Sequence, residues 1–179
     1  MAQGRLHTAV RRWRDVVARL PLPEYTTELG ELFLVLGHRH EAARQFVVVG
    51  TTVRLFDAAG VDTDLEAALF DADHGVRHRA LVNARNEWRR RHSVLVADAL
   101  AWALHVNGHD RAALRMSDRA TRLGSRDARM WLHRGQIEAA LGMNTAARHD
   151  LRFGLSLDPG VSPWQAGRAR AVLHQVVQR

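Results

Sequence analysis

Apolar residues recur along the chain with the spacing of one helix face. The first such stretch, residues 5–20, has arginines opposite its apolar positions, which are Leu6, Val10, Trp13, Val17 and Leu20. This periodicity predicts an amphipathic helix, and Pro21 ends it because proline cannot continue the hydrogen-bond ladder. The pattern predicts nine further helices, over 24–36, 38–59, 62–74, 76–91, 94–107, 109–123, 127–141, 143–157 and 162–178.

Small residues repeat within this pattern at a fixed distance. The positions Ala101, Gly108, Ala113 and Ala120 recur 34 residues later as Gly135, Gly142, Ala147 and Gly154. Small residues let the two helices of a hairpin approach closely, and a glycine accepts the left-handed backbone that ends a helix. A Gly…Ala pair five residues apart also begins at Gly4, Gly37 and Gly75. A period of about 34 residues is typical of stacked helical hairpins.

With these motifs in view, the chain resembles a tetratricopeptide repeat protein of the multi-repeat type found in bacteria. The residues that carry the resemblance are Gly37, Gly75, Gly108, Gly142, Ala42, Ala80, Ala113, Ala147 and Pro159. The resemblance implies an all-α, right-handed α-α superhelix of about four helix pairs. The second pair departs from the pattern, with Ala84 where a large residue is usual and Glu87 where a small one is usual.

We expect a single solenoid domain over residues 1–179. Its parts are a half-repeat helix at 5–20, repeats at about 23–59, 61–92, 94–125 and 127–159, and a capping helix at 162–178. Because the chain opens half-way through a unit, we expect the N-terminal helix to leave an apolar face open. An open face of this kind indicates one of two arrangements. Either the chain is the C-terminal regulatory fragment of a longer repeat protein, or two copies of the chain form a homodimer through this helix.

Composition narrows the class of protein. The 46% apolar content suits a folded chain, and the absence of cysteine excludes disulfides and thiolate chemistry. We find no signal peptide and no apolar run long enough to span a membrane, so we expect a cytoplasmic protein. All 26 basic residues are arginine and the net charge is +7. Binding of nucleic acid or another polyanion is therefore an alternative function, and it would use the arginine-rich second helices, above all residues 77–91.

The resemblance implies a non-enzymatic scaffold whose first helices line a concave groove for a partner peptide or helix. We assign to this groove Glu28, Glu31, Leu65, Glu66, Leu69, Asp73, Asp98, Trp102, His105, Leu132 and Gln136. Because the first helices of the first two units carry acids and the second helices carry most arginines, we expect a protein partner with a basic or apolar segment. The acids also fit a simpler interpretation, as solvated residues favoured by helix dipoles.

We predict no catalytic residues, no cofactor and no metal site. The closely spaced histidine pairs, such as His74 and His78, straddle glycine turns and so do not share one helix face. Asp71, Asp73 and His74 form a dense acid–histidine cluster, which we expect to cap a helix end and to contact neighbouring arginines.

Overall fold

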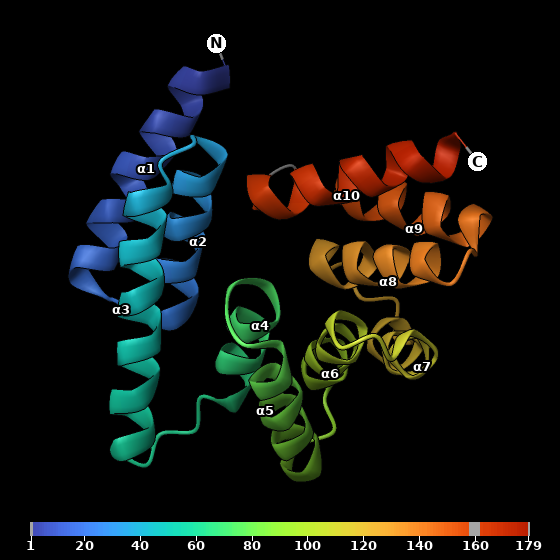
Figure 1. Cartoon of the computed structure of the whole chain (residues 1–179), viewed down its shortest axis with the longest axis horizontal. Coiled ribbons are helices and arrows are strands. Elements are labelled where there is room, and N and C mark those ends of the chain that lie inside the picture. The colour runs from blue at the N-terminus through green and yellow to red at the C-terminus, as the bar shows by residue number, and fades with distance from the viewer. Residues whose placement is uncertain (1, 158–161, 179) are drawn as a thin grey trace. The chain divides into compact units, whose positions relative to one another are not determined.

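The computed structural model describes residues 2–157 and 162–178, and those residues form ten α-helices and no strand (Figure 1). The fold class predicted from the sequence is confirmed as all-α helical hairpins. The coordinates divide into two compact units, one of Met1–Ala67 with Ser162–Trp164 and one of Ala68–Val161 with Gln165–Arg179. The single domain expected from the sequence stays a prediction, and each unit is described by itself.

The first unit is built from α1 (Ala2–Arg19), α2 (Pro23–Val35) and α3 (Arg39–Ala58). Its apolar core joins the three helices and contains Val10, Leu29, Leu32, Phe33 and Ala42, with the half-buried Trp13 and Phe46 packed against it. These are the periodic apolar positions, so burial of one face per helix accounts for the packing. Gly30 of α2 lies directly under the Phe46 ring.

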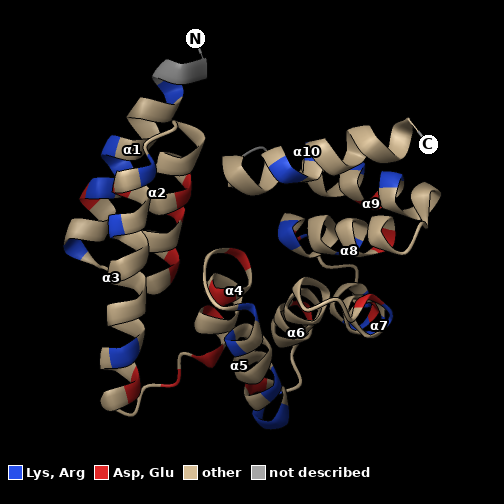
Figure 2. Ribbon diagram, viewed as in Figure 1, with Lys and Arg blue, Asp and Glu red and all other residues tan. Residues whose placement is uncertain are grey.

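The open apolar face expected on the N-terminal helix is not found. Leu6, Val10, Trp13 and Val17 pack into the core of their own unit, and the outward residues of α1 are mainly arginines (Figure 2). Val16, with 39% exposure, is the one large apolar residue of the described part of α1 that is exposed. The structure therefore removes the reason for expecting a homodimer through this helix.

The second unit carries the repeated hairpins. It contains most of α4 (Asp64–His74), then α5 (Arg77–Arg90), α6 (Val94–Val106), α7 (Asp110–Thr121), α8 (Ala128–Ala140), α9 (Asn144–Leu157) and most of α10 (Pro163–Val177). One core runs through α4 to α8 around Ala101 and Trp102, and a second joins Leu132, Leu151 and Ala169 of α8, α9 and α10. The last helix therefore covers the apolar side of the last hairpin, as expected of a cap.

The turn glycines behave as predicted at three of the marker positions. Gly37, Gly108 and Gly142 have φ of 79°, 79° and 75°, the left-handed region in which a side chain is strained. Gly75 does not adopt positive φ, and a glycine is needed there because a Cβ would come 2.9 Å from Asp71 Cα and 3.1 Å from Asp71 Cγ. Gly4 lies inside α1 instead of before it, and Pro159 lies outside the described residues.

The small residues lie where helices touch. Ala101, Ala113, Ala120 and Ala147 are fully buried. A Cβ at Gly135 would come 2.6 Å from Leu151 Cγ, and one at Gly154 would come 2.8 Å from Leu132 Cδ2. The 34-residue pattern is therefore a pattern of helix contacts. No described helix is both long enough and apolar enough to cross a bilayer.

Candidate functional site

Trp102 is the centre of a polar cluster inside the second unit. Its side chain on α6 is 1% exposed. The indole Nε1–H donates to Asp73 Oδ1 of α4 over 3.0 Å, and Arg168 Nη1 of α10 donates to the same oxygen over 2.7 Å. The Arg168 guanidinium carbon also lies 5.4 Å from the centroid of the Trp102 ring. One carboxylate thus holds both an aromatic donor and a cation in place.

The neighbouring hairpin closes the other side of this tryptophan. His133 of α8 stacks on Trp102, with centroids 4.2 Å apart and planes at 6°. His133 Nδ1 lies 3.0 Å from Asp98 Oδ1, and Arg129 Nε lies 3.7 Å from Asp98 Oδ2. We call these six residues the Trp102 cluster: Asp73, Asp98, Trp102, Arg129, His133 and Arg168.

Local sequence explains why these side chains converge. Asp98 and Trp102 are four residues apart on α6, and Arg129 and His133 are four apart on α8, so each pair shares one helix face. The registers of the two helices are fixed by their N-caps: Ser93 accepts from the Val96 N–H over 3.2 Å, and Asp127 accepts from the Arg129 N–H over 2.9 Å. The first helices of successive hairpins therefore present these residues to one another.

Of the residues assigned to the groove from the sequence, only some are accessible. Glu31, Asp98, Trp102 and Leu132 are buried, with exposures of 1–2%, so a partner cannot reach them without rearrangement. The Asp73 side chain is 7% exposed. The half-buried residues are Glu28, Leu65, Glu66, Leu69, His105 and Gln136.

The acids of this face are already bound to other groups. Asp73 pairs with Arg168, and Asp98 lies beside Arg129 and His133. In the first unit, Glu31 accepts a hydrogen bond from Ser162 Oγ. In the second unit, Asp73 and Asp98 are therefore buried, while the Arg129 and Arg168 side chains beside them remain 33% and 39% exposed.

His105 and Gln136 flank the cluster. The His105 ring lies 5.0 Å from the Trp102 ring, and its Nδ1 is 2.6 Å from Asp110 Oδ1. Burial lowers the pKa of His105 below its ordinary value, although Asp110 acts in the opposite direction. Gln136 donates to the Leu132 carbonyl over 3.0 Å.

The acid–histidine cluster at the end of α4 contacts arginines, as the sequence predicted. Asp71 is 2% exposed and receives two hydrogen bonds of 2.5 Å from Arg79, through Nε and Nη2. This bidentate pair raises the pKa of Arg79 further above its ordinary value, the hydrogen bond to Asp71 being the largest cause. Asp71 and Asp73 therefore serve as anchors for guanidinium groups.

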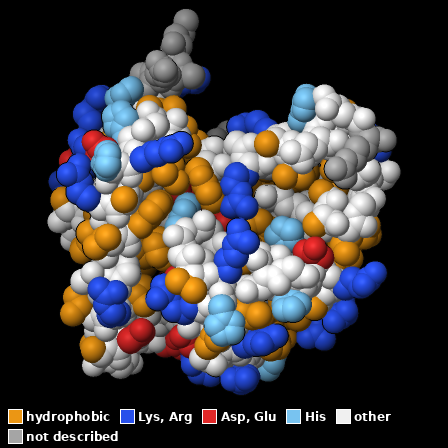
Figure 3. Space-filling model, viewed as in Figure 1, with side chains coloured by type: hydrophobic (Ala, Val, Ile, Leu, Met, Phe, Trp, Pro, Cys, Tyr) orange, Lys and Arg blue, Asp and Glu red, His pale blue; other side chains and the backbone are white. Residues whose placement is uncertain are grey.

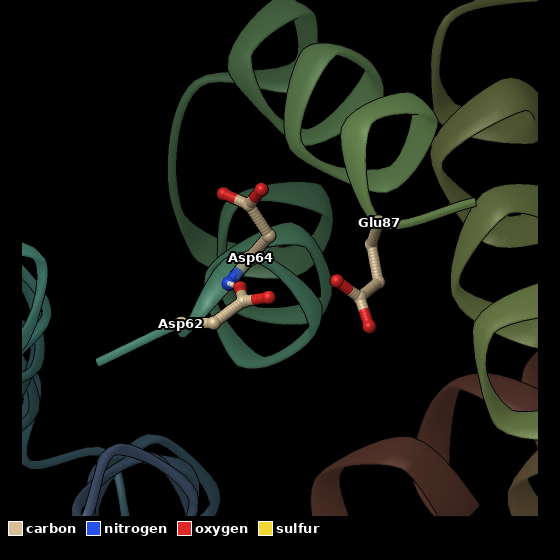
Figure 4. A group of neighbouring side chains, drawn as sticks. All are labelled: Asp62, Asp64 and Glu87. Atoms are coloured by element: carbon tan, nitrogen blue, oxygen red, sulfur yellow. Dashed lines mark hydrogen bonds between the residues drawn. The ribbon is translucent and has the colours of Figure 1, made fainter. Parts of the chain in front are cut away.

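Three further carboxylates are drawn in Figure 4, Asp62 and Asp64 near the start of α4 and Glu87 on α5. Asp62 accepts the Asp64 backbone N–H over 3.1 Å, which caps the helix as expected. Glu87 is fully buried and is bound by Arg90 at the end of its own helix and by Arg91 directly after it. Pairing with two arginines explains how an acid is tolerated at a position where a small residue is usual.

A second set of buried acids lies where α7, α8 and α9 meet. Arg134 of α8 is 3.1 Å from Asp118, 3.6 Å from Glu138 and 3.3 Å from Asp150. Glu138 and Asp150 are 1% and 4% exposed. Burial raises the pKa of Glu138 to about 7, and the Asp150 charge adds to the shift while Arg134 opposes it.

Sequence reasoning missed one member of the Trp102 cluster altogether. Arg168 belongs to the last helix, which was interpreted only as a cap, and the pattern of α10 carries no signal that this arginine reaches α4. Arg129 and His133 occupy groove-facing positions of α8, but their types did not mark them as partners of Asp98 and Trp102.

Comparisons with known proteins give limited similarity. No family model matches the chain, and no curated protein matches it. A crystal structure of MamA protein is similar with 18% sequence identity and a TM-score of 0.49, over 87% of this chain and 86% of that one. A second crystal structure of MamA aligns at 15% identity and a TM-score of 0.43, over 99% of this chain and 85% of that one. Similarity at this level carries no statement about function.

Proposed function

We propose that this chain is a non-enzymatic protein-interaction module, and that the face formed by α4, α6 and α8 binds a partner segment that carries carboxylates. The observation that supports this is the state of the two arginines of the Trp102 cluster. Arg129 and Arg168 are each about one-third exposed, whereas Asp98 and Asp73 beside them are buried; Arg129 also lies 3.9 Å from the one-third exposed Asp127.

The arrangement prepares both guanidinium groups for a second anion. Arg168 uses Nη1 on Asp73 and is further held against the Trp102 ring. Arg129 Nε is buried without a hydrogen-bond partner among the described residues, since 3.7 Å to Asp98 is too long for a hydrogen bond. A guanidinium has five N–H donors in a planar fork that matches a carboxylate, so the one-third exposed Arg129 side chain can offer donors to a ligand. Fixing the side chains beforehand lowers the entropy cost of binding.

The partner chemistry differs from the basic or apolar segment expected from the sequence. That expectation depended on free acids along the first helices, and Asp73 and Asp98 are occupied. Leu69 and Leu95 remain accessible on the same helices, so an apolar residue beside the acidic one fits this face. A preference for basic peptides remains the competing prediction.

An array of short acidic, neutral and basic peptides, followed by fluorescence anisotropy on the best binders, tests the proposal. We expect acidic peptides to bind, and R129Q/R168Q to weaken them about tenfold or more, because charge-assisted hydrogen bonds contribute about 1.5–3 kcal/mol each. R148Q/R152Q on α9 removes the same charge elsewhere and serves as the control. Arg168→Lys keeps the ion pair with Asp73 and secures folding while removing the planar fork. Binding of basic peptides only, or equal losses in both double variants, would refute the proposal.

A further inference from the structure

A pocket lies in the second unit away from the Trp102 cluster. It has a volume of about 350 Å³ and is formed where α5 ends, α6 begins and α7 ends. The side chains that define it are Trp88, His92, Val94, Arg119 and Arg122. Its volume falls in the range of small-molecule sites. We call it the Trp88 pocket.

The two arginines of this pocket lack acidic partners. Among the residues that the structure describes, no carboxylate forms an ion pair with Arg119 or Arg122, in contrast to the arginines of the Trp102 cluster. Arg119 instead lies over Trp88, its guanidinium carbon 5.8 Å from the ring centroid. Both arginines are exposed, so the pocket presents two uncompensated positive charges at its rim.

The surroundings add to this charge. Basic residues lie at the C-terminal end of α5 (Figure 2). They are Arg89 and Arg90, followed by Arg91, and Arg90 and Arg91 are paired with Glu87. Figure 3 shows basic side chains gathered over α5 and α7. Such a group of cations attracts polyanions, and this attraction becomes stronger as the salt concentration falls.

Aromatic and apolar side chains also line the pocket. Trp88 is half-buried, and the His92 ring meets it edge to face, with centroids 4.4 Å apart and planes at 82°. Val94 and the buried Ala97 complete the apolar part. An acidic peptide would use only the cations of this pocket. A ligand with a planar ring would also contact the Trp88 side chain.

We infer that the Trp88 pocket binds a nucleotide unit, in which a planar base lies against Trp88 and a phosphate is held by Arg119 and Arg122. Stacking on an aromatic ring beside a basic surface is the way in which single-stranded nucleic acids are bound without sequence preference. Guanidinium groups match phosphate oxygens in pairs. The unit comes either from a free nucleotide or from a single strand, and the two sources share this chemistry. The inference does not depend on the proposed protein-binding face.

Anisotropy with a labelled single strand of about ten nucleotides, long enough to cover a typical site of this kind, and calorimetry with AMP measure the two sources. R119Q/R122Q tests the phosphate contacts, and R148Q/R152Q is the matched control because it removes two charges from α9, at the half-buried Arg148 and the exposed Arg152. We expect the first double variant to weaken binding about tenfold or more, through loss of charge-assisted contacts, and the control to lose less than about threefold, through loss of general attraction.

The salt dependence gives a second readout. Each phosphate contact contributes about 0.7 to the slope of log affinity against log salt for a single strand. Because both arginines hold one phosphate, R119Q/R122Q should reduce this slope by about 0.7, whereas R148Q/R152Q should leave it unchanged. Trp88→Leu keeps an apolar wall and should weaken binding about fivefold or more by loss of stacking. If this variant does not fold, the exposed arginine pair decides the question.

The outcomes separate the sources from the alternatives. Equal sensitivity of AMP and the strand to R119Q/R122Q supports a site for a single nucleotide, and binding of the strand alone supports a site within a polymer. The inference is overturned if neither binds, if both double variants lose equally, or if an oligoaspartate peptide displaces the labelled strand as well as the unlabelled strand does. R129Q/R168Q should weaken nucleotide binding no more than the R148Q/R152Q control does, which separates this test from that of the protein-binding face.

Discussion

Gly135 and Gly167 offer a matched test of why small residues repeat along this chain. Both lie inside helices, α8 and α10, and neither has positive φ. A Cβ at Gly135 would come 2.6 Å from Leu151 Cγ and 3.0 Å from the Leu151 backbone nitrogen, whereas a Cβ at Gly167 would meet nothing within 4 Å. The same glycine-to-alanine change therefore meets a neighbouring helix at one site and open space at the other.

The two variants should differ in the sign or size of their effect on stability. In both, alanine removes the entropic disadvantage of glycine in a helix, a gain of about 0.5–1 kcal/mol. At Gly135 this gain is opposed by overpacking, which costs about 1–3 kcal/mol, because the backbone of Leu151 cannot move aside as a flexible side chain could. We therefore expect G167A to be stabilised by about 0.5–1 kcal/mol and G135A to lie about 1–3 kcal/mol below it.

Urea unfolding followed by far-UV circular dichroism measures both free energies, with equal m-values as the check that the unfolded states are comparable. Gly154→Ala extends the test, since its Cβ would come 2.8 Å from Leu132 Cδ2 and 3.1 Å from the Ala128 carbonyl oxygen. If G135A proves as stable as G167A within about 0.5 kcal/mol, a limit set by typical surface substitutions, the close-contact explanation of the repeat is wrong.

Three further outcomes follow from buried groups. The pKa of Glu138 is raised to about 7 from an ordinary 4.5. The stabilising effect of the protonated carboxyl is therefore complete below about pH 4.5 and is lost as the pH rises through about 7, so the free energy of unfolding should fall by an amount on the order of 1–3 kcal/mol over that range. E138Q should abolish this fall. Trp102→Phe should cost about 1–3 kcal/mol in thermal or urea unfolding, because Asp73 loses its indole donor. Arg79→Ala should cost about 2 kcal/mol or more, since it leaves the buried Asp71 carboxylate without its bidentate partner, and a change below about 0.5 kcal/mol, as at an ordinary surface site, would contradict this.

The sequence predicted the helices well because each depends on local information. Periodic apolar residues define the faces, and the glycines at 37, 108 and 142 mark left-handed turns that the structure contains. The element bounds differ from the predicted ones by a few residues at most. The open face on the N-terminal helix was wrong because Trp13 and its neighbours, which look unpartnered in the repeat frame, pack against α2.

The chemistry of the site depended on contacts that no local pattern encodes. A repeat frame states which positions share a face, and it placed Asp73, Asp98 and Trp102 on one, but it does not state which charges neutralise each other there. Arg168 lies 95 residues from Asp73 in sequence, yet it binds the carboxylate at 2.7 Å. This single long-range pair neutralises the Asp73 carboxylate and leaves the 39% exposed Arg168 guanidinium at the surface beside it. The charge on this face therefore depends on ion pairs between repeats as well as on the composition of its first helices.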